Sequence, residues 1–179
     1  DVERGAVALR RLSAYGIEYV EQPCATREEM RELRSRVDVR FAVDELIRRS
    51  DGVVTKVSDF ADVAILKPAP LGGVAATVRQ AEALDVPVVV SGSLDSSVGL
   101  ETALAAAAAL PDLPFASGLG TGVLLAEDLG EPLVPCEGRI PVRRSGPSLP
   151  DLLAARDRLS DERAEYWRQR IARAWAVKE

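Results

Sequence analysis

The stretch AVDELIRRS, residues Ala42–Ser50, places Asp44 directly behind a short apolar run. The same arrangement occurs in YVEQPC, where Glu21 closes the run, and in VAILKPAP, where Lys67 does so. One charge behind a strand usually marks only the point where the chain leaves the core. Three successive examples indicate instead that charged side chains gather at one place in the fold.

The spacing of these positions is regular. Glu21 and Asp44 are 23 residues apart, Asp44 and Lys67 are again 23 apart, and Ser91 follows 24 residues later. Strands that alternate with helices at this pitch predict βαβ units and a parallel sheet. Either a doubly wound sheet or part of a (β/α)₈ barrel fits the pattern. In both architectures the functional groups lie at the carboxyl ends of the strands.

The local patterns predict where each element begins and ends. Asp1 is expected to cap the first helix and Gly16 to stop it, and Thr26 and Glu29 form a capping box for the second. The predicted strands cover residues 18–21, 40–44, 63–67, 87–90 and a weak 114–117. The predicted helices cover residues 1–15, 26–37, 73–85, 97–110, 149–159 and 161–176.

Composition narrows the class of protein. The chain has 179 residues, 47% of them apolar, and a net charge of −5, so no electrostatic footprint for nucleic acid or an anionic membrane is present. Its longest apolar run, residues 103–110, is shorter than the ~20 residues that cross a bilayer. The two cysteines form no CxxC pair. We therefore expect a cytoplasmic protein that binds neither nucleic acid nor a membrane.

The chain contains no histidine. This excludes Ser-His-Asp triads, Cys-His pairs and histidine zinc sites. Any bound metal must take oxygen ligands, which favours magnesium, calcium or manganese. Adjacent strand ends lie ~5 Å apart, so Glu21 and Asp44 would repel each other unless a cation lies between them. Lys67 could offset part of that repulsion.

Two polar loops follow the later strands. SGSLDSSVGL, Ser91–Leu100, holds four serines and one aspartate within seven residues, more than a helix cap requires. GLGTG, Gly118–Gly122, could bring backbone N–H groups close to an anion. A capping loop and an ordinary glycine-rich turn explain the two stretches without any ligand, so both interpretations stay open.

The stretches VEQPC, AVDE, LKPAPLGG and SGSLDSSVGL, in this order and spacing, resemble the enolase superfamily over roughly residues 1–122. The resemblance implies an α/β fold, the C-terminal portion of a (β/α)₈ barrel with about five parallel strands. It assigns residues 1–146 to this catalytic barrel and residues 147–179 to C-terminal helices that pack on the barrel or on a capping region.

The resemblance also implies roles for individual residues. Glu21 and Asp44 match ligands of a Mg²⁺ ion, with Mn²⁺ as a substitute, and Lys67 matches the lysine that faces an enediolate. The implied substrate-binding residues are Ser91, Gly92, Ser93, Asp95, Ser96, Gly118, Leu119 and Gly120. The superfamily's Lys-x-Lys base pair and first metal ligand have no match. We therefore expect these residues to be the C-terminal part of a longer protein and to be inactive alone.

The branch that the motifs resemble most catalyses a Mg²⁺-dependent syn dehydration. It converts 2-succinyl-6-hydroxy-2,4-cyclohexadiene-1-carboxylate into an aromatic product in menaquinone biosynthesis. Two alternatives stay open. An N-acylamino acid racemase or dipeptide epimerase of the same superfamily would use similar residues, and a non-catalytic half-barrel could use GLGTG to bind an anion.

Overall fold

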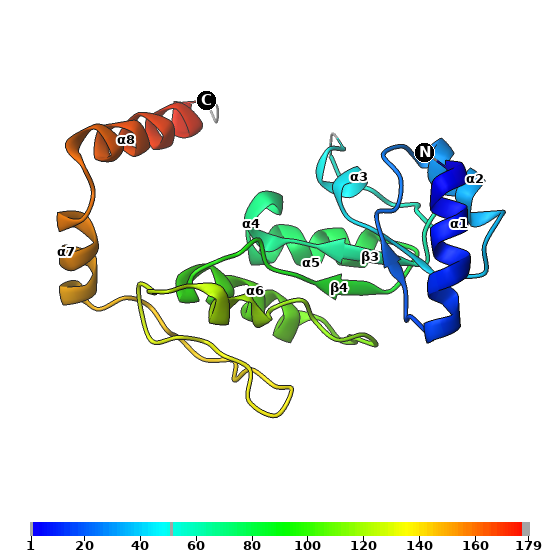
Figure 1. The fold of residues 1–179 in the computed structure, drawn as a ribbon. Helices are drawn as coiled ribbons and strands as arrows, with labels where there is room; N and C mark the ends of the chain where they lie inside the picture. The colour runs from blue at the N-terminus through cyan, green and yellow to red at the C-terminus, as the bar shows by residue number, and fades with distance from the viewer. Residues whose placement is uncertain (1, 51, 177–179) are drawn as a thin grey trace.

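The computed structural model describes residues 2–50 and 52–176 and is built on one parallel sheet (Figure 1). Its strands are β1 (Val20–Glu21), β2 (Phe41–Val43), β3 (Val63–Leu66) and β4 (Val88–Val90). Each strand pairs in parallel with the next along the chain, giving the order β1-β2-β3-β4. A doubly wound sheet reverses its order at a switch point. The unbroken order among the described strands is that of a barrel segment.

The helices follow the expected alternation. They are α1 (Val2–Leu12) with η1 (Ser13–Tyr15), α2 (Arg27–Arg34), α3 (Glu45–Arg48), α4 (Pro68–Leu71), α5 (Val74–Ala83), α6 (Ser97–Ala109), η2 (Gly120–Leu124), α7 (Leu149–Asp157) and α8 (Asp161–Ala176). The capping box of Thr26 and Glu29 is confirmed, and Gly16 ends the first helical segment with φ 65°. The predicted cap at Asp1 lies outside the described residues.

The strands are apolar in both phases because both faces of the sheet are buried. One phase, including Phe41 and Leu66, packs against the covering helices through residues such as Met30. The other phase forms a separate cluster of Ala42, Val63, Ile65 and Val89. The rings of Tyr19 and Phe115 close this second cluster in an edge-to-face contact with centroids 5.6 Å apart. The inner face of the curved sheet is therefore a packed core, as in a barrel interior.

The expected fifth strand is reduced to a single bridge, so the described sheet has four strands rather than about five. Gly118 donates its N–H to the Val90 carbonyl at 3.0 Å and accepts from the Gly92 N–H at 3.0 Å. Gly118 thus pairs where a fifth strand would lie. Pro114 cannot donate to a sheet ladder, which shortens the pairing before it can extend.

Helices α7 and α8 extend away from the sheet (Figure 1). Neither contains a buried residue within its described length. Packing of residues 147–179 on a barrel or capping region therefore stays a prediction. No helix in the part of the chain that the structure describes has the length and apolarity needed to span a membrane.

Candidate active site

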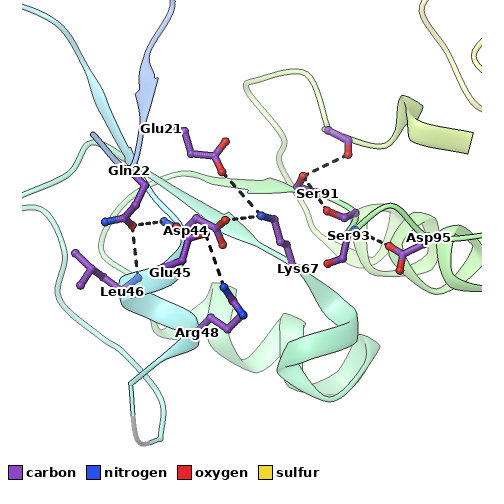
Figure 2. Close-up of polar contacts among 12 residues, drawn as sticks. Glu21, Gln22, Asp44, Glu45, Leu46, Arg48, Lys67, Ser91, Ser93 and Asp95 are labelled. Carbon is purple, nitrogen blue, oxygen red and sulfur yellow. Dashed lines mark hydrogen bonds and ion pairs between the residues drawn. The ribbon is translucent and has the colours of Figure 1, made fainter. Parts of the chain in front are cut away.

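The three charges that close successive strands converge at the carboxyl edge of the sheet (Figure 2). Glu21 is the last residue of β1, Asp44 follows β2, and Lys67 follows β3. The Lys67 ammonium contacts Asp44 Oδ2 and lies 4.0 Å from Glu21 Oε1. The parallel register places these ends side by side, so residues 23 positions apart in sequence share one site.

The three side chains of this cluster are buried to different extents. The Asp44 side chain is 3% exposed, that of Lys67 is 22% exposed and that of Glu21 is 45% exposed. A buried carboxylate needs a partner, and Lys67 supplies the positive charge. Burial, followed by the neighbouring charge of Asp44, raises the pKa of Glu21, while Lys67 lowers it in part. The two carboxylates are thus close enough to interact, and the Lys67 ammonium lies beside both of them.

The second carboxylate of the AVDE stretch does not join the cluster. Glu45 instead lies 3.7 Å from the Arg48 guanidinium within α3. Asp44 alone of the adjacent pair is directed toward Lys67, as Figure 2 shows.

Gln22 is a residue of this site that the sequence analysis missed. Its backbone has φ 44°, a left-handed conformation that non-glycine residues seldom adopt, although Pro23 follows it. Its Oε1 accepts the Asp44 N–H at 3.0 Å, and its Nε2 donates to the Cys24 carbonyl at 2.7 Å. The sequence feature that could have identified Gln22 is its long amide side chain between the end of a predicted strand and a proline.

The serine-rich loop after β4 borders the same edge. Ser91 Oγ donates to the Gly118 carbonyl at 3.3 Å, and the Ser93 N–H donates to Asp95 Oδ2 at 2.7 Å. Asp95 therefore holds the loop in shape. Gly99 is required beneath it, because an added Cβ there would lie 2.7 Å from Asp95 Cβ.

The start of α6 is capped from a distance. Ser96 occupies the N-cap position without a side-chain bond to the helix. Asp128 replaces it, accepting from the Ser97 N–H at 2.9 Å and the Ser97 hydroxyl at 2.8 Å. Burial alone would raise the pKa of Asp128. The hydrogen bonds that its carboxylate accepts from Ser97 and from the backbone N–H groups of Leu129 and Gly130 instead hold that pKa below its ordinary value. Asp128 was a second residue that the sequence analysis missed.

The glycine loop after the bridge is packed closely. An added Cβ at Gly118 would lie 2.6 Å from Ser91 Oγ, so this position tolerates only glycine without rearrangement. Leu119 is 3% exposed and belongs to the cluster that contains Leu100, so only its main chain could face a ligand. Gly120 begins η2. The proposed substrate contacts of this loop remain predictions.

The donor set fits a hard cation in part. Glu21 and Asp44 offer carboxylate oxygens, the ligands that Mg²⁺ and Mn²⁺ prefer. The Lys67 ammonium lies beside both, which shows that the pair accommodates positive charge. Among the described residues, no cluster of three or more histidine, cysteine, aspartate or glutamate side chains is placed to bind one metal ion. Glu21 and Asp44 could therefore supply two ligands of such an ion.

A singly wound parallel sheet with two acids and a lysine at consecutive strand ends is the arrangement of a (β/α)-barrel enzyme site. The matching family model is described as enolase C-terminal domain-like and covers residues 1–149. The chain belongs to this family.

Similar proteins agree with this assignment. An o-succinylbenzoate synthase from Mycobacterium leprae is 52% identical over 84% of this chain and 45% of its own length. One from Mycolicibacterium smegmatis is 46% identical over 98% of this chain and 55% of its own length. The muconate lactonizing enzyme of Pseudomonas fluorescens, solved with muconolactone, matches 86% of this chain and 45% of its own with a TM-score of 0.72 and 26% identity. The chain spans about half the length of the curated relatives it matches.

Proposed function

We propose that the protein to which this chain belongs is an o-succinylbenzoate synthase. The observation that carries the proposal is the convergence of Glu21, Asp44 and Lys67 at consecutive strand ends. Curated relatives bearing that name are 44% and 52% identical to this chain in the comparisons, which supports the choice of reaction. The reaction removes a proton α to a ring carboxylate and expels hydroxide, so that water leaves and the ring becomes aromatic.

Lys67 stabilises the charge that develops on the substrate carboxylate as the α-proton leaves. Lys67 contacts the buried Asp44 carboxylate, and in this proposal it acts by its charge rather than as the base. Fixed positive charge in a water-poor site favours the transition state over the ground state, because the enediolate carries more negative charge than the substrate. The partly buried position of Lys67 meets this requirement.

Glu21 and Asp44 would hold the divalent cation, Mg²⁺ in the first instance and Mn²⁺ as a substitute. When bound, such a cation neutralises charge on the substrate carboxylate. The Asp44 side chain is anchored by burial, whereas the Glu21 side chain is nearly half exposed and can adjust. A rigid ligand beside an adaptable one suits a site that must also admit substrate.

The loops that border this edge would bind the remainder of the substrate, a small dicarboxylic molecule. Ser91, Ser93 and Asp95 lie on the loop after β4, with Ser96 and Gly92 beside them. The main-chain N–H groups of Ser91, Gly92 and Ser93 are already donated within the protein, so the hydroxyls of Ser93 and Ser96 would donate to a succinyl carboxylate. On the neighbouring loop, the Gly118 and Leu119 N–H groups already donate to the Val90 and Ser117 carbonyls, so Gly120 would be the main-chain donor there and the other two residues would line the substrate.

The full-length protein tests the proposal directly. Purified enzyme treated with a chelator should lose formation of the aromatic product, and Mg²⁺ should restore it, as followed by ultraviolet absorbance. The same preparation should be assayed for racemisation of N-acylamino acids. Racemisation without dehydration would select the racemase alternative, and metal-independent anion binding without turnover would select the non-catalytic one.

A further inference from the structure

Gln22 accepts a backbone N–H group at the start of α3, that of Leu46, which the Asp44 carboxylate could otherwise accept as an N-cap. Asp44 is the N-cap residue of α3, and an aspartate there normally folds its carboxylate onto N–H groups of its own first turn. In this structure the Asp44 side chain makes no such cap bond. The Oε1 atom of Gln22 accepts instead, from the Asp44 N–H at 3.0 Å and the Leu46 N–H at 3.5 Å.

The Gln22 amide is itself held at both ends. Its Nε2 donates to the Cys24 carbonyl at 2.7 Å, which fixes which way the Oε1 atom faces. The Gln22 N–H continues the ladder by donating to the Ala42 carbonyl at 2.8 Å. The end of β1 is thereby tied to the start of α3, and Figure 2 shows the amide on the opposite side of Asp44 from Lys67.

We propose that Gln22 is a positioning residue that keeps the Asp44 carboxylate available for a divalent cation. By accepting the Leu46 N–H at the start of α3, the amide removes a competing use of that carboxylate. Asp44 is then directed toward Lys67 and Glu21 rather than toward Leu46. This rests on the proposed function only in assuming that a cation binds between the two carboxylates.

The test measures binding of Mn²⁺ alone to the full-length protein, by the electron paramagnetic resonance signal of free Mn²⁺, without substrate. Gln22→Met removes both hydrogen-bonding ends at similar size and should weaken Mn²⁺ binding tenfold or more. Gln22→Asn is one methylene too short to reach α3 but suits a positive φ better. It should weaken Mn²⁺ binding similarly with no loss of thermal stability.

Gln80 provides a matched control. Its amide also bridges backbone, accepting the Val54 N–H at 3.0 Å and donating to the Val54 carbonyl at 2.5 Å, but on α5 and away from the site. Gln80→Met should lower the melting temperature and leave Mn²⁺ affinity within twofold of wild type. If Gln22 had only a structural role, its variants would likewise lower the melting temperature and leave Mn²⁺ affinity unchanged.

The outcomes separate this inference from the proposed function. Tenfold weaker Mn²⁺ binding in Gln22→Asn supports the inference. If the wild type forms no aromatic product, that result overturns the proposed function and leaves the inference standing. Mn²⁺ affinity within twofold of wild type in Gln22→Asn overturns the inference, whether or not Gln22→Met folds. A wild-type protein that binds no Mn²⁺ overturns it as well.

Discussion

The ends of the first three strands and the loop after the fourth use their polar groups differently. Glu21, Asp44 and Lys67 are directed at one another across the sheet edge. In the loop, Asp95 accepts the Ser93 N–H, and α6 is capped by Asp128 from a distant segment. The first region holds charge that a ligand can share, whereas the second uses its polar groups to fix its own shape. Substitutions at the strand ends should therefore change metal binding and catalysis, whereas substitutions in the loop should change its shape and the stability of the fold.

Lys67→Ala should show the largest effect. It removes the ammonium that we propose faces the developing charge, and the loss of one such electrostatic group costs on the order of 10²–10³ in kcat. It also leaves the buried Asp44 carboxylate without its partner, so thermal stability should fall and be restored by Mg²⁺. Steady-state kinetics and melting curves of the full-length enzyme measure both effects, with the exposed Lys56→Ala as control. Unchanged kcat in Lys67→Ala would remove this residue from the mechanism.

Glu21→Gln should come next. The amide keeps the size of the side chain but loses the negative charge, so Mg²⁺ binding should weaken by at least the roughly 10–100-fold that loss of a hydrogen-bond partner of a metal ligand costs. Activity should recover in part at high Mg²⁺ concentration. Glu45→Gln is the matched control because its carboxylate faces Arg48. Equal loss of Mg²⁺ affinity in both variants would point to net charge rather than ligation.

Asp128→Ala should act on stability at about 1 kcal/mol, the usual worth of an N-cap. The pKa of Asp128 is lower in the folded protein than its ordinary 3.8. The stabilisation is therefore fully present above the ordinary pKa and is lost as pH falls through the folded pKa. Urea unfolding of wild type and variant at pH 7 and near pH 3 should show a difference that shrinks on acidification. A difference independent of pH would show that the charge is not involved.

Substitutions in the loop after β4 should have the smallest effects. Asp95→Ala frees the Ser93 N–H and should alter kcat/KM several-fold for dehydration relative to racemisation of N-acylamino acids. Ser93→Ala should matter less, because Ser93 takes part in that contact through its main chain. Parallel assays of the two substrate classes measure the ratio. Identical changes on both substrates would leave the loop with a structural role only.

The sequence predicted the features that depend on local pattern. The 23-residue spacing placed Glu21, Asp44 and Lys67 at neighbouring strand ends, because parallel strands joined by similar helices end at one edge. The capping box at Thr26 needs only four consecutive residues and was confirmed. The alanine-rich apolar stretch predicted α6, and the polar stretches near the end of the sequence predicted α7 and α8, all within a few residues.

The features that the sequence did not predict depend on tertiary contacts. Asp128 caps α6 from 31 residues away, and no local signal connects it with Ser97. The positive φ of Gln22 runs against the preference of a residue before proline. The weak fifth strand was wrong because a short apolar run next to Pro114 supports only one bridge at Gly118.

The central claim is that Glu21 and Asp44 share a cation beside Lys67. The most direct measurement is anomalous diffraction from crystals of the full-length protein grown with Mn²⁺ and the aromatic product. We predict one peak about 2.1 Å from a carboxylate oxygen of each acid, with the Lys67 ammonium directed at the product carboxylate. A peak elsewhere, or none while product occupies the strand ends, would contradict it.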